Sequence, residues 1–301
     1  MNRLVLLLAL TASGAPVGAQ TAAPCRPAPT GVAVAALLAR ADSVMQVPAA
    51  LGKVLAWSGA RSTLNDYQSD RTYPPFFAQF AAEDGWYDPA TGALRAKGET
   101  RFIGATFPAP EVLSSATAAW LVRDTLRRPV DALLAAALEQ RALLAWPVIR
   151  DWRAATGVTV AGVCPYRDYP RLVLARTVNG IAERLFLDPK TGFPVKLERR
   201  EPDYLRGTVL VEYVWSNWQL TDGVLLPGSA FRMVEGQTHS SSVTSRMALV
   251  PRDSAPALIL PDPALVQQVA TPAFLQPVPP DTVRVGPATY LLRNRGYTHA
   301  V

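Results

Sequence analysis

The stretch GTVLVEYVWSNWQLTDGVLLPGSAFRMVEGQ, residues 207–237, decides the fold. Its first half alternates with a period of two, which predicts a β-strand. One set of alternating positions is Val209, Val211, Tyr213 and Trp215. The intervening residues are also largely apolar, so little of either face is expected to meet solvent. Asp222 and Gly223 form a tight-turn signal, and the chain is expected to return as a second antiparallel strand.

The same pattern extends outward from this stretch. Between residues 157 and 250, short segments with strand periodicity follow one another, among them RLVLARTV (171–178), FPVKLERR (193–200) and SSVTSRMALV (241–250). This succession predicts a meander of antiparallel strands. Residues 53–107 are likewise divided into short segments by Gly and Pro, which predicts further strands and hairpins.

Two near-copies, DPATG from Asp88 and DPKTG from Asp188, raise the question of a repeat or a paired acidic site. Asp at the first position accepts hydrogen bonds within a turn, Pro presets φ, and Gly supplies a positive φ. Their flanking sequences share little. We therefore interpret them as two hairpin turns of the same chemical type and not as catalytic carboxylates.

Two regions have helical periodicity. In CRPAPTGVAVAALLARADSVMQ, residues 25–46, apolar residues recur at helical spacing after Thr30, which is the expected N-cap. A second helical region runs from Val130 to Ala145, and Pro147 is expected to interrupt it before another turn or two. Strands and helices together predict an α+β protein: a strongly curved antiparallel sheet with helices packed on its concave side.

Seven tryptophans are spread over the expected strands and helices. A curved sheet with helices against its concave face encloses either a packed core or an apolar cavity. Tyr213 and Trp215 are the candidate residues for that interior, with core packing and cavity lining both left open.

The amino-terminal residues predict export. Arg3 precedes the apolar run Leu4–Leu10, and small residues stand before Gln20, which is the plan of a secretory signal peptide over residues 1–19. A Pro-rich leader covers residues 20–30. The residues before Cys25 lack a lipobox, and no later stretch has the roughly 20 apolar residues of a membrane helix.

Cys25 and Cys164 are the two cysteines of the chain. Export makes a disulfide between them a reasonable expectation, although sequence alone does not show that they meet. Two cysteines with only His239 and His299 do not predict a metal site.

Neither the charge pattern nor the motifs predict catalysis. The formal net charge is +6, but the basic residues are scattered beside acids, which favours a solvated surface; peripheral contact with an anionic membrane is left open. No nucleic-acid motif accompanies the charge. The sequence contains no G-x-S-x-G, P-loop or G-x-G-x-x-G motif. No catalytic, cofactor-binding or metal-binding residue is therefore predicted.

Residues 183–200 and 207–237 together resemble the periplasmic lipoprotein-carrier superfamily, the LolA/LolB-like domains. The shared features are the D-P-x-T-G-x-P turn from Asp188 to Pro194, a strand ending near Trp218, Asp222-Gly223, and V-x-L-P from Val224 to Pro227. The resemblance implies a half-open antiparallel barrel over residues 31–262. It also implies a hydrophobic binding cavity and a periplasmic location.

Residues 263–280 are crowded with proline and predict a linker. Residues 281–301, DTVRVGPATYLLRNRGYTHAV, are similar to the entry strands of the metallo-β-lactamase fold. That resemblance implies the first strands of an incomplete hydrolase domain. The metal-binding H-x-H-x-D-H motif of that family does not occur here, so zinc is expected only in a downstream domain.

Two functions follow from these resemblances. The first is an exported accessory or binding domain on the amino-terminal side of a metallo-β-lactamase-fold hydrolase, with the catalytic domain absent from this chain. The alternative is a stand-alone periplasmic carrier or sensor of lipid, lipoprotein or another apolar ligand. In both, the chain as given is not expected to be an enzyme, and its partner is an apolar molecule.

Overall fold

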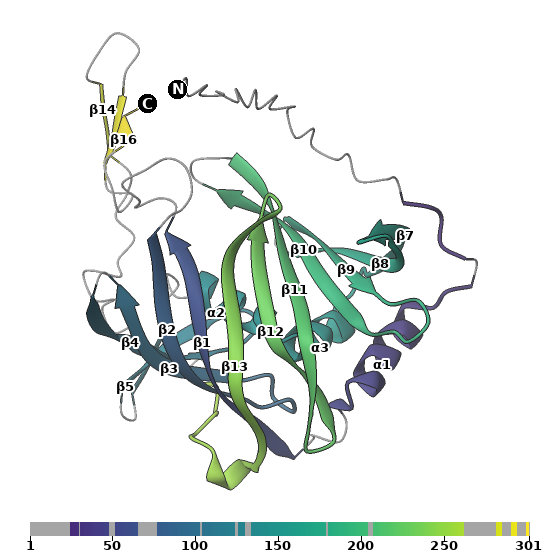
Figure 1. The fold of residues 1–301 in the computed structure, drawn as a ribbon, viewed down its shortest axis with the longest axis horizontal. Helices are drawn as coiled ribbons and strands as arrows, with labels where there is room; N and C mark the ends of the chain where they lie inside the picture. The colour runs from purple at the N-terminus through teal and green to yellow at the C-terminus, as the bar shows by residue number, and fades with distance from the viewer. Residues whose placement is uncertain are drawn as a thin grey trace, which may run out of the picture.

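A computed structural model describes most of the chain between residues 25 and 261 and three short strands after it (Figure 1). The described residues are 25–29, 31–47, 52–65, 77–102, 104–123, 126–129, 134–178, 180–203, 207–261, 281–284, 290–293 and 299–300. The predicted signal peptide and the linker 263–280 lie outside them, as does Thr30.

The main body is one antiparallel sheet whose described part has 13 strands in the order β6-β5-β4-β3-β2-β1-β13-β12-β11-β10-β9-β8-β7. The strands are β1 (Lys53–Asn65), β2 (Phe77–Tyr87), β3 (Leu94–Phe102), β4 (Ala105–Ser114), β5 (Ala119–Arg123), β6 (Leu126–Pro129), β7 (Thr159–Tyr166), β8 (Tyr169–Val178), β9 (Ile181–Leu187), β10 (Pro194–Asp203), β11 (Gly207–Thr221), β12 (Val224–Val234) and β13 (Gln237–Pro251). The sheet is open, because β6 and β7 stand at its opposite ends.

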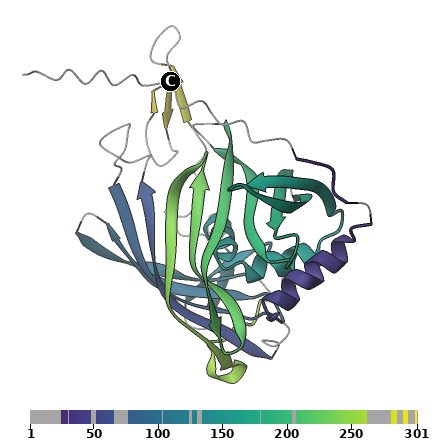
Figure 2. The ribbon, with the colours of Figure 1, turned by 45° about the vertical axis from the view of Figure 1, so that its right-hand side comes forward.

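The order of the strands explains how two meanders make one sheet. Strands β1–β6 and β7–β13 each follow one another along the chain, and β1 pairs with β13 to join the two runs. The chain between β6 and β7 must cross from one edge of the sheet to the other, and the described part of this connection contains two helices. The predicted curved antiparallel sheet with helices on one side is confirmed (Figure 2).

Three α-helices are described: α1 (Val34–Val44), α2 (Leu134–Leu143) and α3 (Trp146–Ala154). α1 has Ala33 as its N-cap without a side-chain hydrogen bond, so the predicted cap at Thr30 was placed three residues too early. Pro147 stands in the first turn of α3, where its missing N–H costs nothing. The helical region therefore divides at Ala145, which has a φ of +61°.

Large side chains from α1, α3 and the strands around β11 fill the interior. Trp146 and Trp152 of α3 are essentially fully buried. The indole N–H of Trp146 donates to the Leu225 carbonyl at 3.2 Å, and that of Trp215 donates to the Ala142 carbonyl at 2.8 Å. These two bonds attach α2 and α3 to β11 and β12. A smaller cluster that includes Val54 and Leu258 lies apart from this core.

The two D-P-x-T-G sequences form equivalent hairpin turns, as predicted: the first joins β2 to β3 and the second joins β9 to β10. The carboxylate of Asp88 accepts from the Ala90 N–H at 2.9 Å, and that of Asp188 accepts from the Lys190 N–H at 3.0 Å. Each carboxylate also accepts from an arginine, Arg252 in the first turn and Arg171 in the second.

Arginines from the helices cover the glycine of each turn. Gly92 and Gly192 have φ values of +74° and +78°, a conformation that favours glycine. A Cβ on Gly192 would lie 2.8 Å from Cγ of Arg40, and one on Gly92 would lie 3.0 Å from Nε of Arg150. The repeated sequence is therefore a repeated way of attaching helices to hairpins.

The last three described strands are β14 (Asp281–Arg284), β15 (Tyr290–Arg293) and β16 (His299–Ala300). They pair antiparallel in a sheet of their own. The strands agree with the β-structure predicted for residues 281–301. They do not identify a metallo-β-lactamase domain, which remains a prediction.

The second turn predicts a specific pH dependence. Burial alone would raise the pKa of Asp188, but hydrogen bonds from Thr191 and Lys190, with the charge of Arg171, outweigh it and lower the pKa. A carboxyl whose pKa is lower in the folded protein contributes stability above its unfolded pKa near 4, and this contribution is lost as the pH falls through the folded value.

We therefore expect Asp188→Asn to lower the free energy of unfolding at pH 7 by roughly 1 kcal/mol, because the amide keeps the acceptor oxygen and loses the charge. The difference from the wild type should shrink as the pH is lowered below about 4. Urea unfolding at a series of pH values measures this. A difference that is constant with pH would contradict the charged role of Asp188.

Candidate functional site

The interior aromatics predicted from the sequence lie in the packed core. Tyr213 is 1% exposed and Trp215 is 4% exposed, and both belong to the cluster formed with α1 and α3. Burial raises the pKa of Tyr213, so its hydroxyl stays neutral. Neither side chain lines the cavity described next, in which different residues take part.

A cavity of about 250 Å³ lies between α2 and the concave face of β1–β4. Its apolar lining includes Ala81, Ala96, Val112 and Ala137. Because α2 crosses the sheet between β6 and β7, it covers this part of the concave face and forms one wall of the cavity. The volume is slightly below the roughly 300 Å³ at which ligand pockets usually begin, which suits a small ligand or one hydrocarbon chain.

Small side chains create this space. On the concave face, register places Ala81 beside Thr100, and Gly98 beside Ala109. Leucine, tryptophan and tyrosine occupy the equivalent face of β9–β11, where the interior is filled. Gly98 also allows a close approach of strands, since a Cβ there would lie 2.1 Å from the Ala82 carbonyl oxygen. The cavity is therefore encoded by an excess of Ala and Gly at alternating strand positions.

Charged and polar residues also line the cavity: Arg61, Glu83, Lys97, Glu99, Thr100 and Gln140. Arg61 and Gln140 both line it, and Arg61 pairs with Glu139 of α2 at 3.5 Å. The carboxylate of Glu139 also accepts from the Ser240 hydroxyl at 3.4 Å. The lining therefore combines apolar and charged residues, and this combination suits an amphiphile.

A network of buried ion pairs lies on the same concave face. Glu183 is 2% exposed and accepts from Nε of Arg176 and Nε of Arg199, both at 2.7 Å. Arg199 also pairs with Glu201 at 3.5 Å. Burial alone would lower the pKa of Arg199, but the charges of Glu183 and Glu201, with the hydrogen bond to Glu183, contribute to an overall rise. The charges are mutually compensated, so the network holds β8, β9 and β10 together and offers no free catalytic group.

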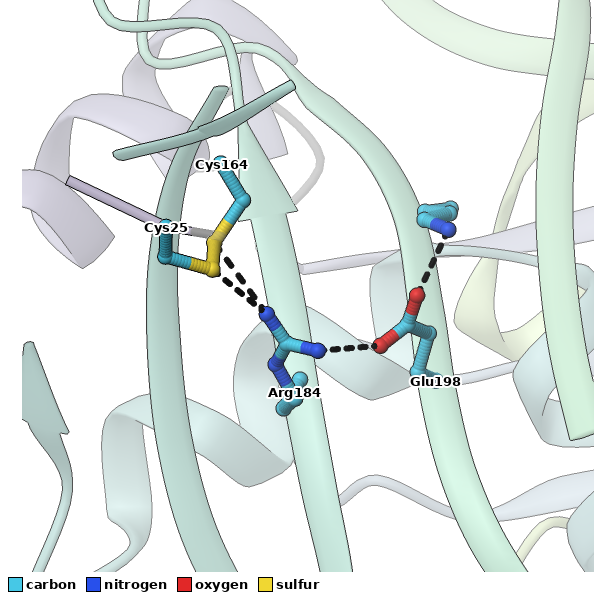
Figure 3. The surroundings of a disulfide bond; sticks show 5 residues. Cys25, Cys164, Arg184 and Glu198 are labelled. Atoms are coloured by element: carbon cyan, nitrogen blue, oxygen red, sulfur yellow. Dashed lines mark hydrogen bonds and ion pairs between the residues drawn. A yellow bond between two sulfur atoms is a disulfide. The ribbon is translucent and has the colours of Figure 1, made fainter. Parts of the chain in front are cut away.

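The cysteines lie on the opposite, convex face of the sheet, where Cys25 and Cys164 form a disulfide (Figure 3). Residue Arg26 also makes a backbone bridge to Val163 of β7. An Arg184 N–H lies 3.2 Å from Sγ of Cys25 and 3.1 Å from Sγ of Cys164, and the same guanidinium bonds Glu198 at 3.1 Å. The disulfide thus attaches the amino-terminal segment to the edge of the sheet.

Lys196 belongs to the same network on the convex face, because it also bonds Glu198. It is 4% exposed and donates to Glu198 at 2.6 Å and to Glu212 at 2.5 Å. Its ammonium group also lies 4.2 Å from the ring centroid of Tyr166 and 4.4 Å from that of Phe186. A buried lysine with two carboxylates and two aromatic faces is fully compensated, which indicates a structural role.

Among the described residues no group of three or more His, Cys, Asp or Glu side chains could hold a metal ion. No helix in the described part of the chain is long and apolar enough to cross a membrane.

Neither a family model nor a curated protein sequence matches the chain. Solved structures with detectable likeness include a DUF1329 family protein from Desulfovibrio piger, at 13% identity and a TM-score of 0.40, covering 71% of this chain and 92% of that one. LprF from Mycobacterium bovis has 10% identity and a TM-score of 0.25, covering 75% and 96%. MucB in complex with MucA(peri) has 14% identity and a TM-score of 0.22, covering 86% and 68%. At these TM-scores none assigns a function.

The sequence contains a signal for the cavity, namely small residues at strand positions, but the residues predicted for the interior were aromatic. Ala96 and Gly98 occupy alternate positions of one segment with strand periodicity, and Ala81 lies in the segment before it. Small residues at core-facing positions of adjacent strands leave space unless a facing element fills it. The connection between β6 and β7 places α2 opposite these small residues. Strand periodicity alone does not predict which helix lies there.

The disulfide predicts a measurable contribution to stability. Cys25 and Cys164 are 139 residues apart, so the crosslink restricts a long loop of the unfolded chain. We expect Cys164→Ser to lower the free energy of unfolding by about 2–5 kcal/mol, measured by guanidinium unfolding. Reductant should destabilise the wild type and leave the variant unchanged. Equal stability of both proteins in oxidising buffer would contradict the expected contribution.

Proposed function

We propose that this chain is an exported binding domain that holds the hydrocarbon chain of a lipid or other amphiphile in the cavity between α2 and β1–β4. The observation that carries the proposal is the apolar lining of small residues beneath α2, with Ala81, Ala96 and Ala137 facing a common space. Burying a hydrocarbon chain there removes its surface from water, which contributes about 0.8 kcal/mol per methylene.

The charged and polar residues of the lining favour an amphiphile over a wholly apolar ligand. Arg61 is about three-quarters covered and its pair with Glu139 is long, at 3.5 Å, so its guanidinium has donors left for a headgroup. The side-chain amide of Gln140 offers both a donor and an acceptor beside it. In this arrangement the chain of the ligand occupies the alanine-lined space and its headgroup meets Arg61.

The resemblance of residues 183–237 to lipoprotein-carrier domains supports the same class of ligand, and the predicted signal peptide supports a periplasmic location. A carrier or sensor is the form of this function that the chain could perform by itself.

The further proposal, that residues 281–301 begin a metallo-β-lactamase-fold domain, is supported by their sequence and by the separate sheet of β14–β16. An H-x-H-x-D-H motif encoded beyond codon 301 is its test, and zinc would belong there.

Filling the cavity tests the binding proposal directly. Ala81→Phe places a ring in the space beneath α2, and we expect retention of fatty acid or phospholipid in native mass spectrometry to fall at least about tenfold. Val243→Phe is the matched control, because Val243 is a strand residue that is 52% exposed and does not line the cavity. The control should bind as the wild type does.

Thermal unfolding of both variants shows whether they are folded. A folded Ala81→Phe protein that retains lipid as well as the wild type does would overturn the assignment of the cavity. So would a wild-type chain that takes up no amphiphile from a lipid extract.

A further inference from the structure

A second pocket lies where α1, α3 and the first D-P-x-T-G turn meet. Its volume is about 330 Å³, within the range of small-molecule sites. Asp42 of α1, Tyr87 at the end of β2, and Arg150 and Arg153 of α3 line it with Pro89. It shares no lining residue with the cavity beneath α2, so the two sites are independent.

Two residues that line this pocket each carry a buried polar atom with no hydrogen-bond partner among the described residues. The atoms are the hydroxyl of Tyr87 and Oδ1 of Asp42, and the two residues are 1% and 6% exposed. Buried polar atoms are nearly always paired, because an unpaired one costs about 1–3 kcal/mol. Burial raises the pKa of Tyr87, so its hydroxyl remains protonated and can donate. One orphan is thus a donor and the other an acceptor.

Two guanidinium groups complete the pocket. Arg153 forms an ion pair with the other carboxylate oxygen of Asp42, and Arg150 donates to the Ala90 carbonyl at 2.7 Å. Each of these contacts uses one nitrogen of the guanidinium, and a guanidinium carries five N–H donors. The lining residues therefore carry two positive charges and one negative charge, with donors to spare.

We propose that this pocket binds a small phosphate ester that carries a free hydroxyl group. Phosphate oxygens accept from the Tyr87 hydroxyl and from Arg150 and Arg153, since guanidinium groups match the geometry of phosphate. The hydroxyl of the ligand donates to Oδ1 of Asp42. One ligand thereby satisfies both orphan atoms. The same chemistry occurs in a free polyol phosphate and in the headgroup of a glycerophospholipid.

Isothermal titration of the full chain with glycerol 3-phosphate tests the site. Tyr87→Phe removes only the unpartnered hydroxyl, so we expect affinity to fall about tenfold or more while the midpoint of thermal unfolding without ligand stays the same or rises. Tyr213→Phe is the matched control. Its hydroxyl belongs to a side chain buried in the core that does not line this pocket, so this variant should bind as the wild type does.

Two further probes define the ligand. Inorganic phosphate should bind more weakly than glycerol 3-phosphate, because it lacks the ester's hydroxyl for Asp42. Dihexanoyl phosphatidylglycerol distinguishes the sources: tighter binding than glycerol 3-phosphate assigns the site to a lipid headgroup, and weaker binding assigns it to a free ester.

Three results would overturn the proposal. The first is no heat of binding for any probe at concentrations up to about 10 mM. The second is unchanged affinity in Tyr87→Phe. The third is a loss of affinity in Tyr213→Phe as large as that in Tyr87→Phe. The Ala81→Phe experiment concerns a different cavity. A negative result there does not affect the proposal for this pocket, and a negative result here does not affect the proposal for the cavity beneath α2.

Discussion

The hydrogen bond from the Trp215 indole to the Ala142 carbonyl fixes the position of α2, and the interior of the molecule depends on that position. The same end of the helix is held from another side by Arg141, which donates to the Gly92 carbonyl at 2.7 Å and pairs with Asp151. A helix attached at its carboxyl end to β11 and to the β2–β3 turn cannot settle freely onto the sheet. Where small residues such as Ala81, Ala96 and Gly98 stand on the sheet beneath it, space remains.

The concave face therefore has three zones with different chemistry. Large apolar side chains of β9–β11 pack with α1 and α3 and supply most of the buried apolar surface. Compensated ion pairs around Glu183 connect neighbouring strands without leaving a reactive charge. The small side chains of β2–β4 leave unfilled space, which is the cavity. In this third zone, apolar side chains face a space that another molecule can enter.

Local rules predicted much of the fold. Alternation identified the strands around Val211, Asp222-Gly223 gave the β11–β12 turn, and the two D-P-x-T-G turns follow from turn chemistry. The site was less predictable. The large residues Tyr213 and Trp215 were the predicted interior candidates, but they belong to the packed core, and many residues that line the cavity are small. The contact of Arg40 with Gly192 joins residues far apart in the chain. Periodicity describes only neighbouring residues, so it does not predict such contacts. The pairing of Cys25 with Cys164 was open for the same reason.

The most direct test of this account is a crystal structure of the chain with a medium-chain fatty acid. We expect hydrocarbon density between α2 and β2–β4, in contact with Ala81, Ala96 and Ala137, with the carboxylate near Arg61. The Trp215–Ala142 hydrogen bond should be intact. A structure in which α2 rests directly on the sheet and closes the cavity, or in which the fatty acid binds elsewhere, would contradict it.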